Sequence, residues 1–93
     1  MTVQVLLPGV LAELAGGSRR LDLDVPAGTV ADLLDALAEV HPVLVRRVRD
    51  ETGALRRYVN VYVDGADVRG QQGRLTEVPS GAVVHVLPSV AGG

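Results

Sequence analysis

Residues 25–37 read VPAGTVADLLDAL, and this stretch decides the fold. A Pro-Ala-Gly break interrupts the extended chain, and Thr29 then stands where its hydroxyl can cap a helix. Asp32, three residues on, also favours the positive end of a helix. Apolar residues follow at the i, i+3, i+4, i+7 spacing of an amphipathic helix, at Val30, Leu33, Leu34 and Leu37. We therefore predict an amphipathic helix, with Leu34 as a core anchor in the middle of its apolar face.

Two strands are expected before this helix. Residues 2–7 are rich in β-branched residues, and residues 19–25 alternate apolar and polar side chains. A helical turn over residues 10–15 and a glycine loop connect them. Leu21 and Leu23 should share the inward face, which predicts an antiparallel hairpin with one face toward water.

Further strands are expected near the end of the sequence. Residues 58–63 (YVNVYV) have a strong strand pattern, and Asp64-Gly65 indicates a tight turn. Val68 and Arg69 are expected to add a very short strand, and residues 82–87 to form the last one. Helix and strands are segregated along the chain, so the predicted fold class is α+β. We expect a mixed four- to five-stranded sheet packed on one main helix.

A basic segment lies between these two halves. The main helix should end near His41, because Pro42 follows it, and residues 43–49 offer a second helical segment. Residues 46–57 carry five Arg against two acids, whereas the chain as a whole has a net charge of −2. The stretch Arg46–Arg57 is interpreted as the solvated end of a helix, with contact to a partner or a phosphate as the alternative.

Composition excludes several classes of function. The 93 residues, 47% hydrophobic and 22% charged, suit one globular domain. There is no Cys, so disulfides, zinc–thiolate sites and thiol nucleophiles are excluded, and no Lys for a P-loop or a Schiff base. The only aromatic residues are Tyr58 and Tyr62, which argues against single-stranded nucleic acid as a partner. Without a long apolar run or a signal-peptide pattern, a cytoplasmic protein is expected.

The sequence offers little for catalysis. His41 and His85 lack metal-ligand spacing, and no nucleophile-elbow pattern surrounds the serines. We therefore expect that the chain is not an enzyme and binds neither metal nor cofactor.

The sequence finishes LPSVAGG over residues 87–93. Glycine has no Cβ, so a catalytic pocket can close tightly around a Gly-Gly end, and the six residues after Leu87 reach about 20 Å when extended. We expect residues 1–88 to form the domain and residues 89–93 a flexible tail. The tail would thread Val90, Ala91 and Gly92 into a partner's active site and present the carboxylate of Gly93.

These features resemble the ThiS/MoaD family of ubiquitin-like sulfur carriers, which have the β-grasp fold. The likeness covers essentially the whole chain and rests on four segments: residues 25–30, residues 59–65 (VNVYVDG), residues 79–88 and residues 90–93 (VAGG). Within the family, residues 58–69 and the AGG ending look most like actinobacterial carriers for cysteine synthesis. Arg without Lys and Val without Ile fit the GC-rich genome of such a source.

The resemblance implies a mechanism and a set of partners. An E1-like enzyme of the MoeB/ThiF type would adenylate Gly93 with ATP, and a sulfur donor would convert it to a thiocarboxylate. The sulfur acceptor would be a cysteine synthase, thiosugar synthase, molybdopterin synthase or thiazole synthase. In the cysteine case the acceptor holds pyridoxal phosphate, and a metalloprotease releases the product. ATP and pyridoxal phosphate belong to these partners.

Two other functions stay open, and a docking surface is expected as well. The chain could be a protein modifier that forms isopeptide bonds through Gly93, or a non-catalytic interaction module. His85 and Leu87 should lie on the outward face of the last strand, beside the tail. We predict that these two residues bind partners.

Overall fold

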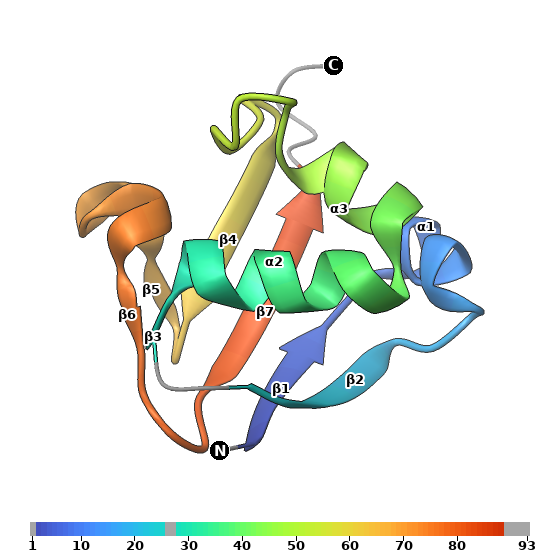
Figure 1. Ribbon diagram of the computed structural model, residues 1–93, viewed down its shortest axis with the longest axis horizontal. Helices are drawn as coiled ribbons and strands as arrows, with labels where there is room; N and C mark the ends of the chain where they lie inside the picture. Colours follow the sequence, from blue (N-terminus) through green and yellow to red (C-terminus); the bar gives the residue numbers. More distant parts are fainter. Residues whose placement is uncertain (1, 26–27, 89–93) are drawn as a thin grey trace.

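The computed structural model describes residues 2–25 and 28–88, and the predicted α+β class is confirmed. In chain order the elements are β1 (Thr2–Leu6), α1 (Gly9–Ala12), η1 (Glu13–Ala15), β2 (Arg20–Asp24), β3 (Gly28–Thr29), α2 (Val30–Val40), α3 (Pro42–Val48), β4 (Val59–Val63), β5 (Ala66–Asp67), η2 (Val68–Gly70), η3 (Gly73–Leu75), β6 (Glu77–Val78) and β7 (Val83–Pro88). The main sheet has five strands in the order β2-β1-β7-β4-β5, and helix α2 lies across one of its faces (Figure 1).

The sheet is mixed because β1 and β7 run parallel, whereas the pairs β1–β2, β4–β7 and β4–β5 are antiparallel. The predicted hairpin of the first two strands is therefore confirmed, with a helical turn between them. β7 lies in the middle of the sheet, hydrogen-bonded on both sides. This central place fixes the position and direction of β7 as far as Pro88.

Helix α2 begins as the sequence predicted. The Thr29 hydroxyl accepts a hydrogen bond from the Asp32 backbone N–H at 3.3 Å, and the Asp32 carboxylate accepts one from the Thr29 backbone N–H at 2.9 Å. This reciprocal pair is a capping box, which satisfies two backbone donors that the helix itself leaves free. A Cβ at Gly28 would collide with the Asp32 carboxylate, so the box also requires glycine there.

The core lies between the sheet and the helices. All four residues of the predicted stripe are buried, and Leu34 is only 2% exposed. The facing strands contribute mainly valines, at Val3, Val5, Val59, Val61, Val63, Val84 and Val86. Burying each such side chain contributes roughly 1.5–3 kcal/mol. None of the helices in the described residues is long and apolar enough to span a bilayer.

Two parts of the predicted strand pattern are corrected. Val68 and Arg69 form no strand, because β5 is Ala66–Asp67 and η2 follows at once. Val68 is buried, so the chain bends toward the core at this residue. The Asp67 carboxylate caps the bend by accepting a hydrogen bond from the Arg69 backbone N–H at 2.9 Å. The small sheet of β3 and β6 was not predicted, because strands of two residues have no detectable alternation.

Candidate functional site

The end of β7 positions whatever follows it in the chain. Pro88 pairs with Val59 of β4, so the last described residue lies beside the start of β4. The predicted tail segment Val90, Ala91 and Gly92, and the predicted reactive residue Gly93, lie outside the described residues. The described part of the site is therefore the surface around Pro88.

His85 and Leu87 lie on the outer face of the sheet, opposite the helices. They alternate along β7 with the buried Val84 and Val86, and each is half-buried. The strand register places His85 between Leu6 of β1 and Tyr62 of β4, and places Leu87 opposite Asn60. The structure thus brings both predicted residues together on one face; their role in binding stays a prediction.

This outer face mixes apolar and polar groups. Its half-buried members on the three central strands are Gln4, Leu6, Asn60, Tyr62, Val83, His85 and Leu87. Partly covered apolar side chains beside hydrogen-bonding groups are typical of surfaces that bind and release other proteins. The face can therefore supply contacts for docking, although it contains no pair of groups arranged for acid–base chemistry.

Arg69 joins the outer face to the segment before β4, and sequence reasoning missed it. Its guanidinium donates hydrogen bonds to the Asn60 side chain and to the backbone carbonyls of Arg56 and Arg57, the latter two at 3.0 and 3.1 Å. The signal was present in the turn. The Asp64-Gly65 turn folds the chain back along β4, and the turn of η2, capped by Asp67, then brings Arg69 beside Asn60.

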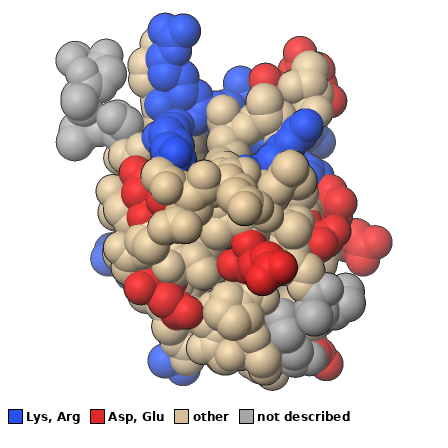
Figure 2. Space-filling model, turned by 90° about the vertical axis from the view of Figure 1, so that its left-hand side faces the viewer, with Lys and Arg blue, Asp and Glu red and all other residues tan. Residues whose placement is uncertain are grey.

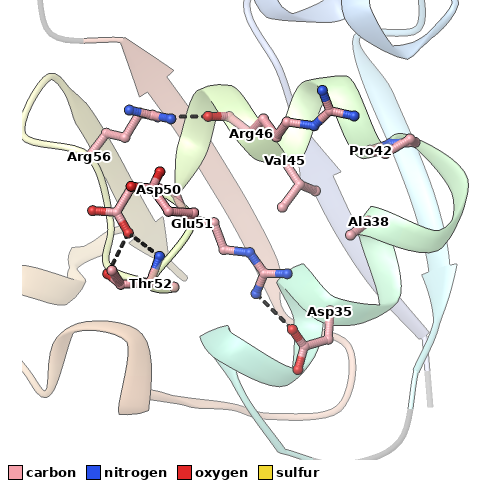
Figure 3. A pocket seen from close by; sticks show the side chains of 11 residues that line it. Asp35, Ala38, Pro42, Val45, Arg46, Asp50, Glu51, Thr52 and Arg56 are labelled. Atoms are coloured by element: carbon pink, nitrogen blue, oxygen red, sulfur yellow. Dashed lines mark hydrogen bonds and ion pairs between the residues drawn. The ribbon is translucent and has the colours of Figure 1, made fainter.

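A cleft of about 490 Å³ opens on the other side of this segment, between α2, α3 and residues 50–56 (Figure 3). Ala38, Pro42 and Val45 form its apolar part. The Arg49 guanidinium crosses it to the Asp35 carboxylate at 2.7 Å. Because the Asp35 side chain is 69% exposed, this ion pair contributes at most about 1 kcal/mol.

The wall of the cleft is a loop organised by Asp50. Its carboxylate accepts hydrogen bonds from the Thr52 hydroxyl at 2.6 Å, from the Thr52 N–H at 2.8 Å and from the Ala54 N–H at 3.2 Å. The two hydrogen bonds from Thr52 are the main reason that the pKa of Asp50 lies below its ordinary value. Asp50 is thus committed to holding the loop.

The described residues offer no metal centre. Within residues 2–25 and 28–88, no three His, Asp or Glu side chains lie close enough together to hold a metal ion. The described part of the chain therefore offers a mixed polar and apolar surface around β7 and a cleft beside α3.

Comparison with known proteins agrees with this arrangement. The model of the ThiS family matches residues 5–93. The sulfur carrier protein CysO of Mycobacterium tuberculosis is 33% identical over 95 residues and covers 100% of both chains. The small archaeal modifier protein 1 of Haloferax volcanii is 39% identical over 85 residues, which cover 89% of this chain and 91% of that protein.

A solved structure extends the likeness to three dimensions. A chain in the crystal structure of the BexX/CysO complex of Amycolatopsis orientalis superposes with a TM-score of 0.79 and 35% identity, covering 98% of this chain and 99% of that chain. The predicted ubiquitin-like β-grasp fold is thereby confirmed. The CysO relatives come from Mycobacterium and Amycolatopsis, which fits the actinobacterial source expected from composition.

Proposed function

The chain belongs to the ThiS family, as its motifs predicted, and from this premise we propose that it is a sulfur carrier whose Gly93 carboxylate is converted to a thiocarboxylate. The observation that carries the proposal is the identity of 33% to a protein named as a sulfur carrier, over the full length of both chains. The relatives are named as carriers or modifiers, which supports a protein co-substrate rather than an enzyme.

The proposed activation takes two steps in an E1-like partner of the MoeB/ThiF type. A carboxylate oxygen of Gly93 attacks the α-phosphorus of ATP, which forms an acyl adenylate and releases pyrophosphate. Hydrosulfide from a sulfur donor then attacks the acyl carbon, so that a C–S bond replaces the C–O bond to AMP and the proton passes to solvent. The thiocarboxylate is a sulfur nucleophile, a group that the side chains of this Cys-free chain do not provide.

The domain's part in this chemistry is to dock and to direct the tail. The outer face around His85 and Leu87 lies on β7, the strand that leads directly into residues 89–93. A partner bound to that face would hold the departure point of the tail in a fixed place. Docking would thus help to position the Gly93 carboxylate in the partner's active site. Such positioning matters because a displacement of the reacting group near 1 Å can cost about a hundredfold in rate.

The acceptor is proposed to be a biosynthetic enzyme. A cysteine synthase or a thiosugar synthase is favoured over a molybdopterin or thiazole synthase, because the CysO relatives are 33% and 35% identical, whereas a putative molybdopterin converting factor subunit of Pyrococcus furiosus is 27% identical. The complex of BexX with CysO supports such a partner, since a relative of this chain binds another protein there. ATP would be used by the activating enzyme, and pyridoxal phosphate by an acceptor of the cysteine-synthase type.

The match to small archaeal modifier protein 1 favours a second candidate function. As a modifier, the chain would form an isopeptide bond between Gly93 and a lysine of another protein. It has no lysine of its own, so it could not be extended into a lysine-linked polymer.

Intact mass spectrometry of the protein from its own cells separates these functions. A carrier shows a species in which one sulfur replaces one oxygen, located at Gly93 by fragmentation. A modifier shows adducts of higher mass, with the chain joined to lysines of other proteins. An unmodified chain under all sulfur-supply conditions would contradict the carrier proposal.

A further inference from the structure

The arginines around residues 46–57 fall into two sets with different roles. One set makes hydrogen bonds or ion pairs to hold the fold, and it consists of Arg49, Arg56, Arg69 and Arg74. Within the described residues, the exposed guanidiniums of Arg46, Arg47 and Arg57 make no hydrogen bond or ion pair. These three cations are therefore available to another molecule.

The nearby acids offset only part of this charge, because residues 46–57 carry five Arg against two acids. Asp35 is paired with Arg49 at 2.7 Å, and the Asp50 carboxylate is occupied by the loop hydrogen bonds of Thr52 and Ala54. Of the acids within residues 46–57, only Glu51 has no such hydrogen bonds. Figure 2 shows many of the basic side chains in that view at the upper end of the molecule, with an acidic group beside them at the upper right and other acidic side chains lower down.

This positive region adjoins the point where the chain leaves the domain. Val59, the partner of Pro88 in the sheet, donates its backbone N–H to the Arg56 carbonyl at 3.1 Å, so Arg57 lies inside the turn that borders the end of β7. The Arg56 guanidinium in turn donates to the Arg46 carbonyl at 2.6 Å. A continuous series of contacts thus connects Pro88 to the backbone of the last turn of α3, while the Arg46 side chain extends along the cleft toward Pro42 (Figure 3).

An exposed aromatic side chain completes the surface. Tyr58, between Arg57 and Val59, is 56% exposed. Tyrosine and arginine are the residue types, with tryptophan, that most often dominate protein–protein binding energy. We call the group Arg46, Arg47, Arg57 and Tyr58 the arginine collar.

We propose that the arginine collar docks on an acidic protein surface around the opening through which the activating enzyme receives the tail. The proposal rests on the carrier function proposed above. Any protein that takes in the chain beyond Pro88 must come close to Arg57 and Tyr58, because these two residues of the collar precede Val59, the partner of Pro88. Opposite charge there would speed association and fix the orientation in which the tail enters.

A nucleic acid fits the collar less well. The whole chain has a net charge of −2 and a pI of about 5.5, whereas nucleic-acid-binding domains are strongly basic. The acidic residues on the rest of the surface would repel an extended polyanion. A local acidic patch on a folded protein meets the collar without facing those acids.

The test measures binding of the full chain to the activating enzyme of the same organism. The variant Arg47→Gln/Arg57→Gln removes two charges from the collar, and Arg47→Lys/Arg57→Lys keeps them. Arg19→Glu changes the net charge by the same amount as the Gln pair, but beside the edge strand β2. Each is titrated at about 0.1 M and about 1 M salt, between which the Debye length falls from about 10 Å to about 3 Å.

The Gln pair should raise the dissociation constant about tenfold at low salt and match the wild type at high salt. The Lys pair and Arg19→Glu should stay within about twofold of the wild type. Equal binding by the Gln pair at low salt would overturn the proposal. A second result would also overturn it: the wild type binds a poly-uridine RNA with salt-sensitive affinity, only the Gln pair loses that affinity, and binding to the enzyme is unchanged.

Intact mass after incubation with ATP and a sulfur donor separates this inference from the carrier function. If the wild type binds through the collar but gains no sulfur, the carrier proposal fails and the collar stands. If the chain gains sulfur and the Gln pair binds normally, the collar fails and the carrier proposal stands. A wild type that does not bind the enzyme contradicts both.

Discussion

The two faces of the central sheet are made by alternate residues of the same strands, and they differ sharply. On the inner face, Val3, Val5, Val61, Val84 and Val86 are each no more than 1% exposed. On the outer face, their neighbours Gln4, Leu6, Tyr62, His85 and Leu87 are half-buried. The same strands therefore contribute buried valines to the core on the face toward the helices and a mixed polar and apolar surface on the outer face. The following predictions test that division.

The largest expected effect on stability is in the core. Leu34→Ala should lower the free energy of unfolding by about 2–5 kcal/mol, because a buried leucine leaves a cavity. The same change on the outer face, Leu87→Ala, should lower it by about 1 kcal/mol or less. Urea unfolding of the two variants measures both values. Equal losses would show that the core between helix α2 and the sheet is no more important for stability than the outer face.

On the outer face, the expected effect is on binding. His85→Glu should weaken binding to the activating enzyme about tenfold, which corresponds to about 1.4 kcal/mol. Its free energy of unfolding should change by no more than about 0.5 kcal/mol. His85→Gln keeps a polar side chain without the negative charge and should have a smaller effect on binding. Unchanged affinity in both variants would remove this face from the docking model.

The capping box should have a moderate effect on stability alone. Thr29→Ala removes the hydroxyl that accepts from the Asp32 N–H and should cost about 1 kcal/mol in unfolding free energy. Thr29→Ser keeps that hydroxyl and should stay close to the wild type. Affinity for the activating enzyme should be the same in all three proteins, and a change in affinity would connect the start of α2 to docking.

The smallest expected effect concerns pH. The pKa of Asp50 is lowered in the folded protein, mainly by its hydrogen bonds with Thr52, so its charged form stabilises the fold above its ordinary pKa of 3.8. That contribution is lost as the pH falls below about 4. Asp50→Asn should therefore flatten the acid end of the stability profile measured by thermal unfolding. Asp22→Asn, an exposed residue of β2, is the control; an equal flattening there would contradict the assignment.

Much of the fold could be predicted because its signals are local. The spacing of Val30, Leu33, Leu34 and Leu37, with Thr29 before them, was enough to place α2 and its cap. Asp64 and Gly65 both have positive φ, as the predicted tight turn requires. The short strand expected at Val68 was wrong, because burial of that side chain depends on the rest of the fold.

The site was less accessible from sequence. Alternation along β7 placed His85 and Leu87 on one face, but their neighbours Leu6 and Tyr62 come from strands distant in the chain. The interpretation of residues 46–57 as simply solvated is incomplete. Arg49 and Arg56 hold the fold through a carboxylate and a carbonyl, and only the contacts could separate them from the free arginines.

Deleting Gly93 tests the central claim most directly. The deletion moves the chain end back by about 3.5 Å, and appending one residue converts the Gly93 carboxylate to an amide. Wild type and both variants are incubated with the activating enzyme, ATP and a sulfur donor, and their intact masses are followed with time. The wild type should exchange one oxygen for one sulfur, while both variants keep their fold and their affinity but gain sulfur at least about a hundredfold more slowly. If either variant gains sulfur at the wild-type rate, Gly93 is not the carrier residue.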